Sequence, residues 1–191
     1  MRLFIAVELP PAALAAATMA SQALRVRVAQ DAARARLTWV TPDRMHITVR
    51  FIGDADPDQG QAIIAALAAP LDAACFSLTL KGAGAFPDRG APRALWLALD
   101  GSAAAAVRVV EEKVSARLAA AGIPRESRPF SPHLTLARVR DPGGLRRSIV
   151  QGVAAPAHPG ERVEAITLFE SRLSPKGPTY TALQRTPLRS E

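Results

Sequence analysis

The sequence of 191 residues predicts an internally duplicated α+β protein, in which two sheet-based lobes face each other across a cleft. Strand-like and helix-like segments alternate through both halves of the chain, and no linker separates the halves. One short pattern, His-apolar-Thr-apolar, occurs twice, at 46–49 and at 133–136. Both copies lie in alternating runs rich in apolar residues, which is typical of strands with one buried face. We therefore expect a single duplicated domain over 1–191, with one motif in each lobe.

Proline, glycine and capping residues separate the elements of the first half. The Pro10-Pro11 pair opens an alanine-rich helix, and Gly53 ends the first motif strand. Asp56 provides an N-cap for the next helix, with Pro57 in its first turn. The expected elements are a strand at 3–7, a helix at about 11–34, the motif strand at 46–52, a helix from 57 to about 69, and strands at about 76–82 and 93–99, which are joined by a loop at 84–90.

The second half is expected to begin with a helix between Ser102, its N-cap, and Gly122, where it ends. Pro132 directly precedes His133 and occupies the first position of the second motif strand, where a missing N–H costs no ladder hydrogen bond. The remaining elements are an irregular arginine- and glycine-rich connector at 141–160 and a closing strand pair at 162–170 and 178–184.

The composition excludes several classes of protein. A hydrophobic content of 49% with 21% charged residues suffices for a packed core and excludes a disordered chain. The single cysteine, Cys75, excludes an intramolecular disulfide and a multi-cysteine zinc site, and we expect a buried thiol. Glu8, Pro10 and Pro11 interrupt the apolar start of the chain too early for a secretion signal, and no segment approaches the ~20 apolar residues of a membrane span. A cytoplasmic protein that does not associate with a membrane is expected.

The net charge is +7, and arginine supplies most of it. Six arginines lie within 125–147, around the second motif. Because guanidinium groups bind phosphate bidentately, this balance favours an anionic ligand. Codon bias toward alanine and arginine would produce the same composition.

The two motifs can supply a pair of proton-transfer groups. Successive strand side chains point to opposite faces, so His46 and Thr48 share one face, as do His133 and Thr135. Imidazole serves as either base or acid near neutral pH, and two imidazoles on opposite sides of a phosphorus suit an in-line displacement. The hydroxyls can donate hydrogen bonds to the phosphate oxygens. No Asp, Glu or Cys shares this face as a third metal ligand, so we expect a metal-free site.

Three arginines are candidate phosphate ligands, although each is also compatible with a role as a surface charge. Arg50 follows the first motif histidine by four positions and would share its face. Arg138 follows the second by five positions and reaches the cleft only if the strand bulges or ends near Ala137. Arg128 could reach the cleft from the loop before the second motif. The third histidine, His158, lies in the irregular connector and is expected to be exposed and without a role.

These residues resemble the two-histidine (2H) phosphoesterase superfamily, and more narrowly the bacterial and archaeal RNA 2′,3′-cyclic phosphodiesterases, once named 2′-5′ RNA ligases. The resemblance implies a bilobal, pseudo-twofold α+β fold, with two mainly antiparallel sheets facing a central cleft and helices outside. It runs nearly end to end, through the segments Arg2–Ala6, His46–Gly53, Pro92–Trp96, Phe130–Arg138, Leu168–Ser171 and Gly177–Tyr180.

The implied activity is metal-independent and cofactor-free hydrolysis of a terminal RNA 2′,3′-cyclic phosphate to a 2′-phosphomonoester, with 2′-5′ RNA ligation as the reverse chemistry at the same site. The implied partner is RNA with such an end, for example a tRNA fragment, bound by a monomer. The implied roles are His46 as proton donor to the departing 3′ oxygen, His133 as the acceptor that activates water, Thr48 and Thr135 as ligands of the phosphate oxygens, and Arg138 as a phosphate ligand ahead of Arg50 and Arg128.

Two alternatives remain open at this stage. A 2H enzyme could act instead on a small cyclic nucleotide or an ADP-ribose cyclic phosphate, because the motifs recognise only the phosphate. A non-catalytic module could bind RNA ends with the same fold. Intact histidine and threonine in both copies argue against the second alternative, since binding alone needs no pair of titrating groups. One tyrosine and two tryptophans also offer few surfaces for base stacking.

Overall fold

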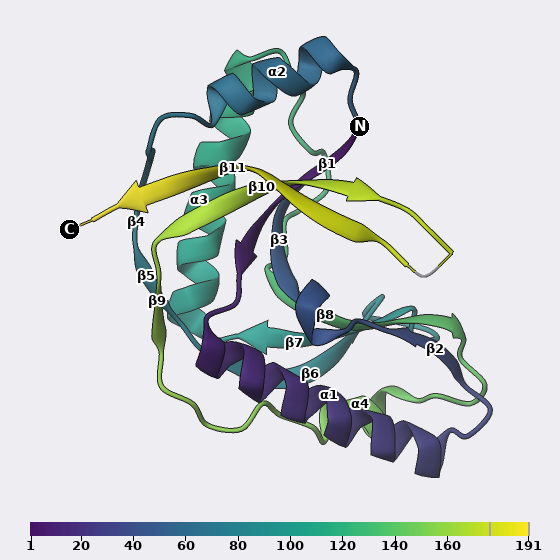
Figure 1. Cartoon of the computed structure of the whole chain (residues 1–191). Helices are drawn as coiled ribbons and strands as arrows, with labels where there is room; N and C mark the ends of the chain where they lie inside the picture. Colours follow the sequence, from purple (N-terminus) through teal and green to yellow (C-terminus); the bar gives the residue numbers. More distant parts are fainter. Residues whose placement is uncertain (176, 191) are drawn as a thin grey trace.

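The computed structural model describes residues 1–175 and 177–190, and helices alternate with strands along the chain (Figure 1). The helices are α1 (Pro11–Asp31), α2 (Pro57–Ala66), α3 (Gly101–Ala120) and α4 (Arg147–Gln151), with a 3-10 turn at Pro42–Arg44. The strands are β1 (Arg2–Glu8), β2 (Arg36–Trp39), β3 (His46–Asp54), β4 (Leu71–Ala74), β5 (Phe76–Leu78), β6 (Leu80–Phe86), β7 (Ala94–Leu99), β8 (His133–Asp141), β9 (Glu161–Val163), β10 (Ala165–Arg172) and β11 (Thr179–Arg189).

The two motif strands lie side by side in the middle of the sheet. Within the described residues, nine strands form one sheet in the order β4-β11-β10-β1-β3-β8-β7-β6, with β2 also paired to β8, while β5 and β9 form a separate pair. Strands β3 and β8 run antiparallel and share a single register pair, Ile47 with Leu134. The sheet therefore consists of a β1 part (β4, β11, β10, β1 and β3) and a β8 part (β8, β7, β6 and β2), joined at the motifs (Figure 1).

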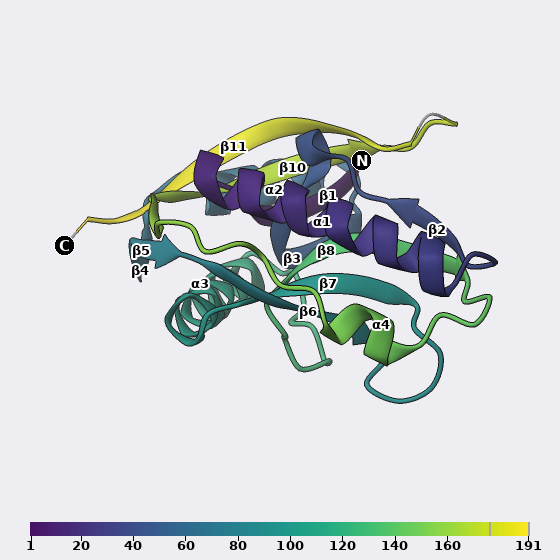
Figure 2. The ribbon, with the colours of Figure 1, turned by 90° about the horizontal axis from the view of Figure 1, so that it is seen from below.

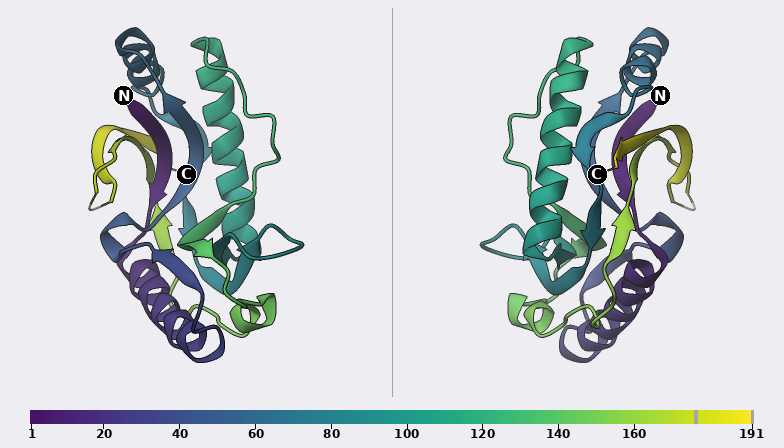
Figure 3. Two further views of the ribbon diagram at one scale, coloured as in Figure 1. Left: turned by 90° about the vertical axis from the view of Figure 1, so that its right-hand side faces the viewer. Right: turned by 90° about the vertical axis from the view of Figure 1, so that its left-hand side faces the viewer.

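The helices cover the two parts in a crossed arrangement. Helix α1 follows β1 in the chain but packs against β6 and α4, which belong to the β8 part. Helix α3 follows β7 but packs against β3, β4 and β5. In both views of Figure 3, α3 runs through the upper part of the molecule and α1 lies in the lower part, and Figure 2 shows α1 from below. Each part of the sheet is thus assembled from segments of both halves of the sequence.

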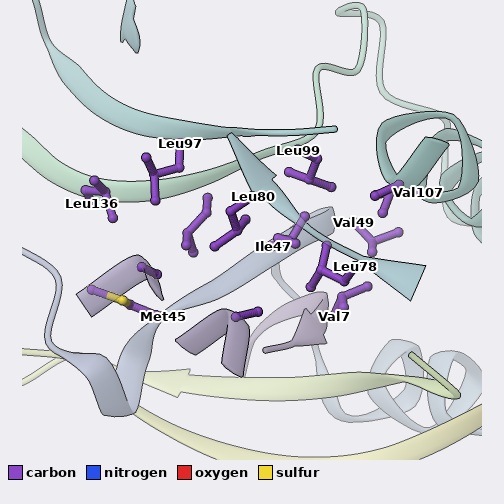
Figure 4. Close-up of a cluster of buried hydrophobic side chains, with 14 of the residues drawn as sticks. Val7, Met45, Ile47, Val49, Leu78, Leu80, Leu97, Leu99, Val107 and Leu136 are labelled. Atoms are coloured by element: carbon purple, nitrogen blue, oxygen red, sulfur yellow. The ribbon is translucent and has the colours of Figure 1, made fainter. Parts of the chain in front are cut away.

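A continuous core fixes the orientation of the motif strands. The apolar motif residues Ile47, Val49, Leu134 and Leu136 are at most 2% exposed, as the sequence predicts. Figure 4 shows Ile47, Val49 and Leu136 in this core. Full burial of one such side chain contributes roughly 1.5–3 kcal/mol, so a slip of one residue in either strand would be strongly unfavourable. The histidines and threonines are consequently held on the other face. Cys75 is a buried free thiol, as expected.

Several element boundaries differ from the sequence-based expectation. The predicted strand at 76–82 is divided between β5 and β6, and β6 extends into the predicted loop at 84–90. This extension is possible because Gly84 lies beneath the indole of Trp96, where any side chain would collide. Asp100 rather than Ser102 caps α3, because its carboxylate accepts the backbone N–H of Ala103 at 2.8 Å.

The remaining differences concern the ends of two helices and the connector. Helices α1 and α2 each end three residues earlier than expected, and the connector at 141–160 contains the short helix α4. His158 is partly buried rather than exposed, because its Nε2 accepts the backbone N–H of Leu80 at 3.0 Å. Across 1–175 and 177–190, no helix is long and apolar enough to cross a membrane.

Candidate active site

The two motif strands have the same local structure. From the histidine onward, both show the same burial sequence over six residues: partly buried, buried, partly buried, buried, buried and exposed. The adjacent buried residues arise from a β-bulge in each strand, at Val49 opposite β1 and at Leu136 opposite β7. A bulge inserts one unpaired residue, so the alternation of side chains reverses beyond it. The fourth residue after each histidine is therefore buried, and the fifth faces the cleft.

This reversal decides where the two strand arginines lie. Arg138, the fifth residue after its histidine, lines a cavity together with His46, Thr48 and Thr135. The regular alternation expected for Arg50 does not hold, since its side chain is only 7% exposed and its Nη2 donates to the carbonyl of Pro124. Arg50 nevertheless forms part of the wall of a second cavity.

Each histidine is held by the carbonyl group two residues before it. The Nδ1–H of His46 donates to the Arg44 carbonyl at 2.8 Å, and the Nδ1–H of His133 donates to the Ser131 carbonyl at 2.7 Å. Arg44 ends the 3-10 turn that precedes β3. Because a carbonyl can only accept, both bonds fix the same tautomer and leave Nε2 unprotonated.

Aromatic rings hold each imidazole from the side. The ring centroid of His46 lies 4.9 Å from that of Phe4 and 5.4 Å from that of Tyr180. The ring centroid of His133 lies 5.0 Å from that of Phe86, in an edge-to-face arrangement. Centroid separations in this range are typical of favourable aromatic pairs, and they restrict both imidazole rings to one orientation.

The surroundings of both imidazoles favour their neutral form. Burial lowers the pKa of His46, the Arg44 carbonyl opposes this, and the positive charge of Arg138 lowers the pKa further. Burial likewise lowers the pKa of His133, against the Ser131 carbonyl and together with the Arg138 charge. One guanidinium thus acts on both histidines.

Two cavities that share part of their walls lie at the motifs and together make up the cleft. The His46 cavity, of about 380 Å³, is lined by His46, Thr48, Thr135 and Arg138 and also by Arg2 and Arg44. The His133 cavity, of about 420 Å³, is lined by His133, Thr48, Arg50, Arg128, Phe86 and Phe130. Thr48 lines both cavities, as does Phe51. Arg128 is 87% exposed at its side chain and pairs with Glu126 at 3.2 Å.

Sequence reasoning missed four cleft residues, Arg2, Phe4, Arg44 and Tyr180. Arg2 and Phe4 lie on one face of β1, and Tyr180 comes from β11 at the other end of the chain. Arg2, Phe4 and Tyr180 lie in terminal segments that resemble the 2H family, and this resemblance is the signal that could have found them. Among the described residues, no group of three His, Cys, Asp or Glu side chains could hold a metal ion.

Comparison with known proteins identifies the family. The family model described as the 2′-5′ RNA ligase superfamily matches residues 10–173. The chain belongs to this superfamily. An RNA 2′,3′-cyclic phosphodiesterase of Thermus thermophilus is 35% identical over 203 residues, which cover 100% of this chain and 92% of that protein. A protein of the same name from Aeropyrum pernix is 31% identical over 146 residues, covering 75% of this chain and 82% of that protein.

Solved structures agree with this membership. A crystal structure of a Thermus thermophilus protein superimposes with a TM-score of 0.74 at 30% sequence identity and covers 100% of both chains. The structure of E. coli LigT complexed with 3′-AMP gives a TM-score of 0.67 at 24% identity over 98% of this chain and 97% of that chain, and so shares the fold. The predicted fold class, an α+β 2H phosphoesterase-like fold, is confirmed.

Proposed function

We propose that this member of the superfamily hydrolyses a 2′,3′-cyclic phosphate at the end of an RNA to a 2′-phosphomonoester. The observation that carries the proposal is the matched pair of histidines, each held in the same tautomer by the carbonyl two residues earlier, in adjoining cavities that share Thr48. Two threonines and Arg138 line the same cleft. The names of the relatives from Thermus thermophilus and Aeropyrum pernix support the choice of substrate.

The histidines would act on opposite sides of the phosphorus. Nε2 of His133 takes a proton from water as the water oxygen forms a bond to phosphorus, and the bond from phosphorus to O3′ breaks. His46 carries a proton of its own on Nε2 and gives it to O3′, which leaves as the 3′-hydroxyl. Hydroxyls of Thr48 and Thr135 and the guanidinium of Arg138 bind the non-bridging oxygens, where negative charge increases in the transition state.

Because the pKa of His46 is lowered, some other group must favour its protonation before it can act as the acid. Burial and the charge of Arg138 favour the neutral imidazole. A bound phosphate brings a negative charge that partly neutralises the Arg138 guanidinium and attracts a proton to the nearby histidine. Substrate binding would therefore generate the acid that the reaction needs. The same pair of groups would form a 2′-5′ linkage if a 5′-hydroxyl took the place of water.

The test uses an RNA oligonucleotide that ends in a 2′,3′-cyclic phosphate, with protein that has been treated with EDTA. We expect a 2′-phosphomonoester, identified by chromatography against 2′- and 3′-phosphate standards. His46→Ala and His133→Ala should each lower kcat by ~10²–10⁴, whereas His158→Ala should retain it. A 3′-phosphate product, or activity that EDTA removes and a divalent ion restores, would contradict the proposed reaction.

A further inference from the structure

Positive charge collects at one end of the cleft. Three guanidinium groups, those of Arg2, Arg44 and Arg138, line the His46 cavity, and no Asp or Glu of the described residues lines it. They come from three separate elements, β1, the 3-10 turn and β8. Since like charges repel one another, such a grouping favours the binding of an anion.

The arginines at the other end of the cleft already have protein partners. In the His133 cavity, Arg50 donates to a backbone carbonyl and Arg128 pairs with Glu126. Glu111 also lines this cavity. In the His46 cavity, by contrast, the described residues provide no ion pair for Arg2 or Arg138. Arg44 has only a 3.7 Å contact with an exposed aspartate, Asp43.

The three guanidinium groups act on different titratable groups. Arg138 lies close enough to both catalytic candidates to lower the pKa of each imidazole. The charges of Arg44, Arg138 and Arg2 oppose the burial that raises the pKa of Tyr180. Arg2 and Arg44 therefore lie near Tyr180, on the wall of the His46 cavity.

We propose that Arg2 and Arg44 form a second phosphate site, which binds the phosphodiester directly 5′ of the terminal nucleotide. This inference rests on the proposed function, which places the terminal cyclic phosphate against Arg138 and the histidines. A cyclic mononucleotide has one phosphate and leaves the second site empty, whereas an RNA end fills both. The second site thus selects RNA ends over cyclic mononucleotides.

The experiment removes the charge of the inner phosphate by replacing one of its non-bridging oxygens with a methyl group. The substrates are two adenosine dinucleotides with a terminal 2′,3′-cyclic phosphate, one with the natural phosphodiester linkage and one with an uncharged methylphosphonate linkage. Wild-type protein should show a kcat/KM about 25-fold higher for the charged linkage, at about fivefold for each exposed ion pair. Arg2→Gln and Arg44→Gln should each lower this ratio about fivefold.

A matched control removes one positive charge elsewhere. Arg162 is exposed, pairs with Glu164 on the protein surface and lines neither cavity, so Arg162→Gln should keep the wild-type ratio. Equal hydrolysis of both dinucleotides by the wild type would overturn the second site and leave the proposed function intact. A ratio that stays at the wild-type value in Arg2→Gln and Arg44→Gln would also overturn it. Turnover of neither substrate would overturn the proposed function and this inference with it.

Discussion

Gly84→Ala is the substitution whose effect the structure defines most sharply. Gly84 of β6 is paired with Trp96 of β7, and the indole lies directly over it. A Cβ at this position would lie 2.3 Å from Cη2 and 2.4 Å from Cζ2 of Trp96. Because non-bonded carbon atoms are in favourable contact at about 3.5–4.0 Å, the indole must move by more than about 1 Å.

That movement would be transmitted to the catalytic candidate. The Trp96 ring lies 5.0 Å from the Phe86 ring, which lies 5.0 Å from the ring of His133. Overpacking of this kind usually costs about 1–3 kcal/mol of unfolding free energy. A misplacement of about 1 Å at a reacting group can lower the rate about 10²-fold. We therefore expect Gly84→Ala to lower both stability and kcat by these amounts.

The measurements are urea unfolding, followed by circular dichroism, and kcat on a cyclic-phosphate-ended oligonucleotide. Gly101→Ala is the matched control, because no atom lies within 4 Å of its added Cβ and it is the first residue of α3. This control should keep kcat and be unchanged or more stable by about 0.4–1 kcal/mol. If Gly84→Ala matched Gly101→Ala in both measurements, the proposed transmission from the indole to His133 would be wrong.

Three further predictions concern charge and protonation. Arg138→Gln removes a charge that lowers both histidine pKa values, so both limbs of the kcat/KM profile should move to higher pH, and KM should rise about tenfold. Arg140→Gln removes an exposed charge from the same strand that lines neither cavity, and should change neither the limbs nor KM. The folded-state pKa values of His46 and His133 lie below the unfolded value of 6.5, so the unfolded chain binds more protons than the folded protein, and the unfolding free energy should decrease as pH falls below 6.5. Urea unfolding midpoints measured between pH 8 and pH 5 should show this decrease in the wild type. The decrease should be flatter in the His46→Gln/His133→Gln double variant. His158→Ala leaves a partly buried backbone N–H without its acceptor and should cost about 1–2 kcal/mol in urea unfolding without a change in kcat.

The sequence predicted the features that depend on local pattern. The two motifs, their apolar faces and the α+β class follow from strand alternation and from the residues that end each element. The bulges do not follow from alternation, because an unpaired residue depends on how the neighbouring strand is hydrogen-bonded. Regular alternation places Arg50 on the same face as His46, whereas the pairing with β1 reverses the facing beyond Val49, and Arg50 lines the His133 cavity.

The missed cleft residues have a different cause. Arg2 and Tyr180 approach the first motif through strands that are far apart in the chain, and no local pattern reports such pairing. Arg44 is two residues before His46, yet the sequence does not show that its backbone and its side chain have separate functions. Its carbonyl fixes a tautomer, while its side chain lines the cavity. Only the fold shows that one residue does both.

The crossed packing of the helices has a consequence for how the two sides of the cleft can move. A sheet joined by one register pair would be expected to flex at that joint. Here, however, the polypeptide passes back and forth between the β1 part and the β8 part, so the covalent chain itself limits their separation. Neither part can form from one half of the sequence alone. A truncation before residue 165 removes β10, which pairs with β1, and β11, which pairs with β10, and the β8 part needs β2 from the first half. Limited proteolysis at one surface loop should accordingly leave the two sides of the cleft held together.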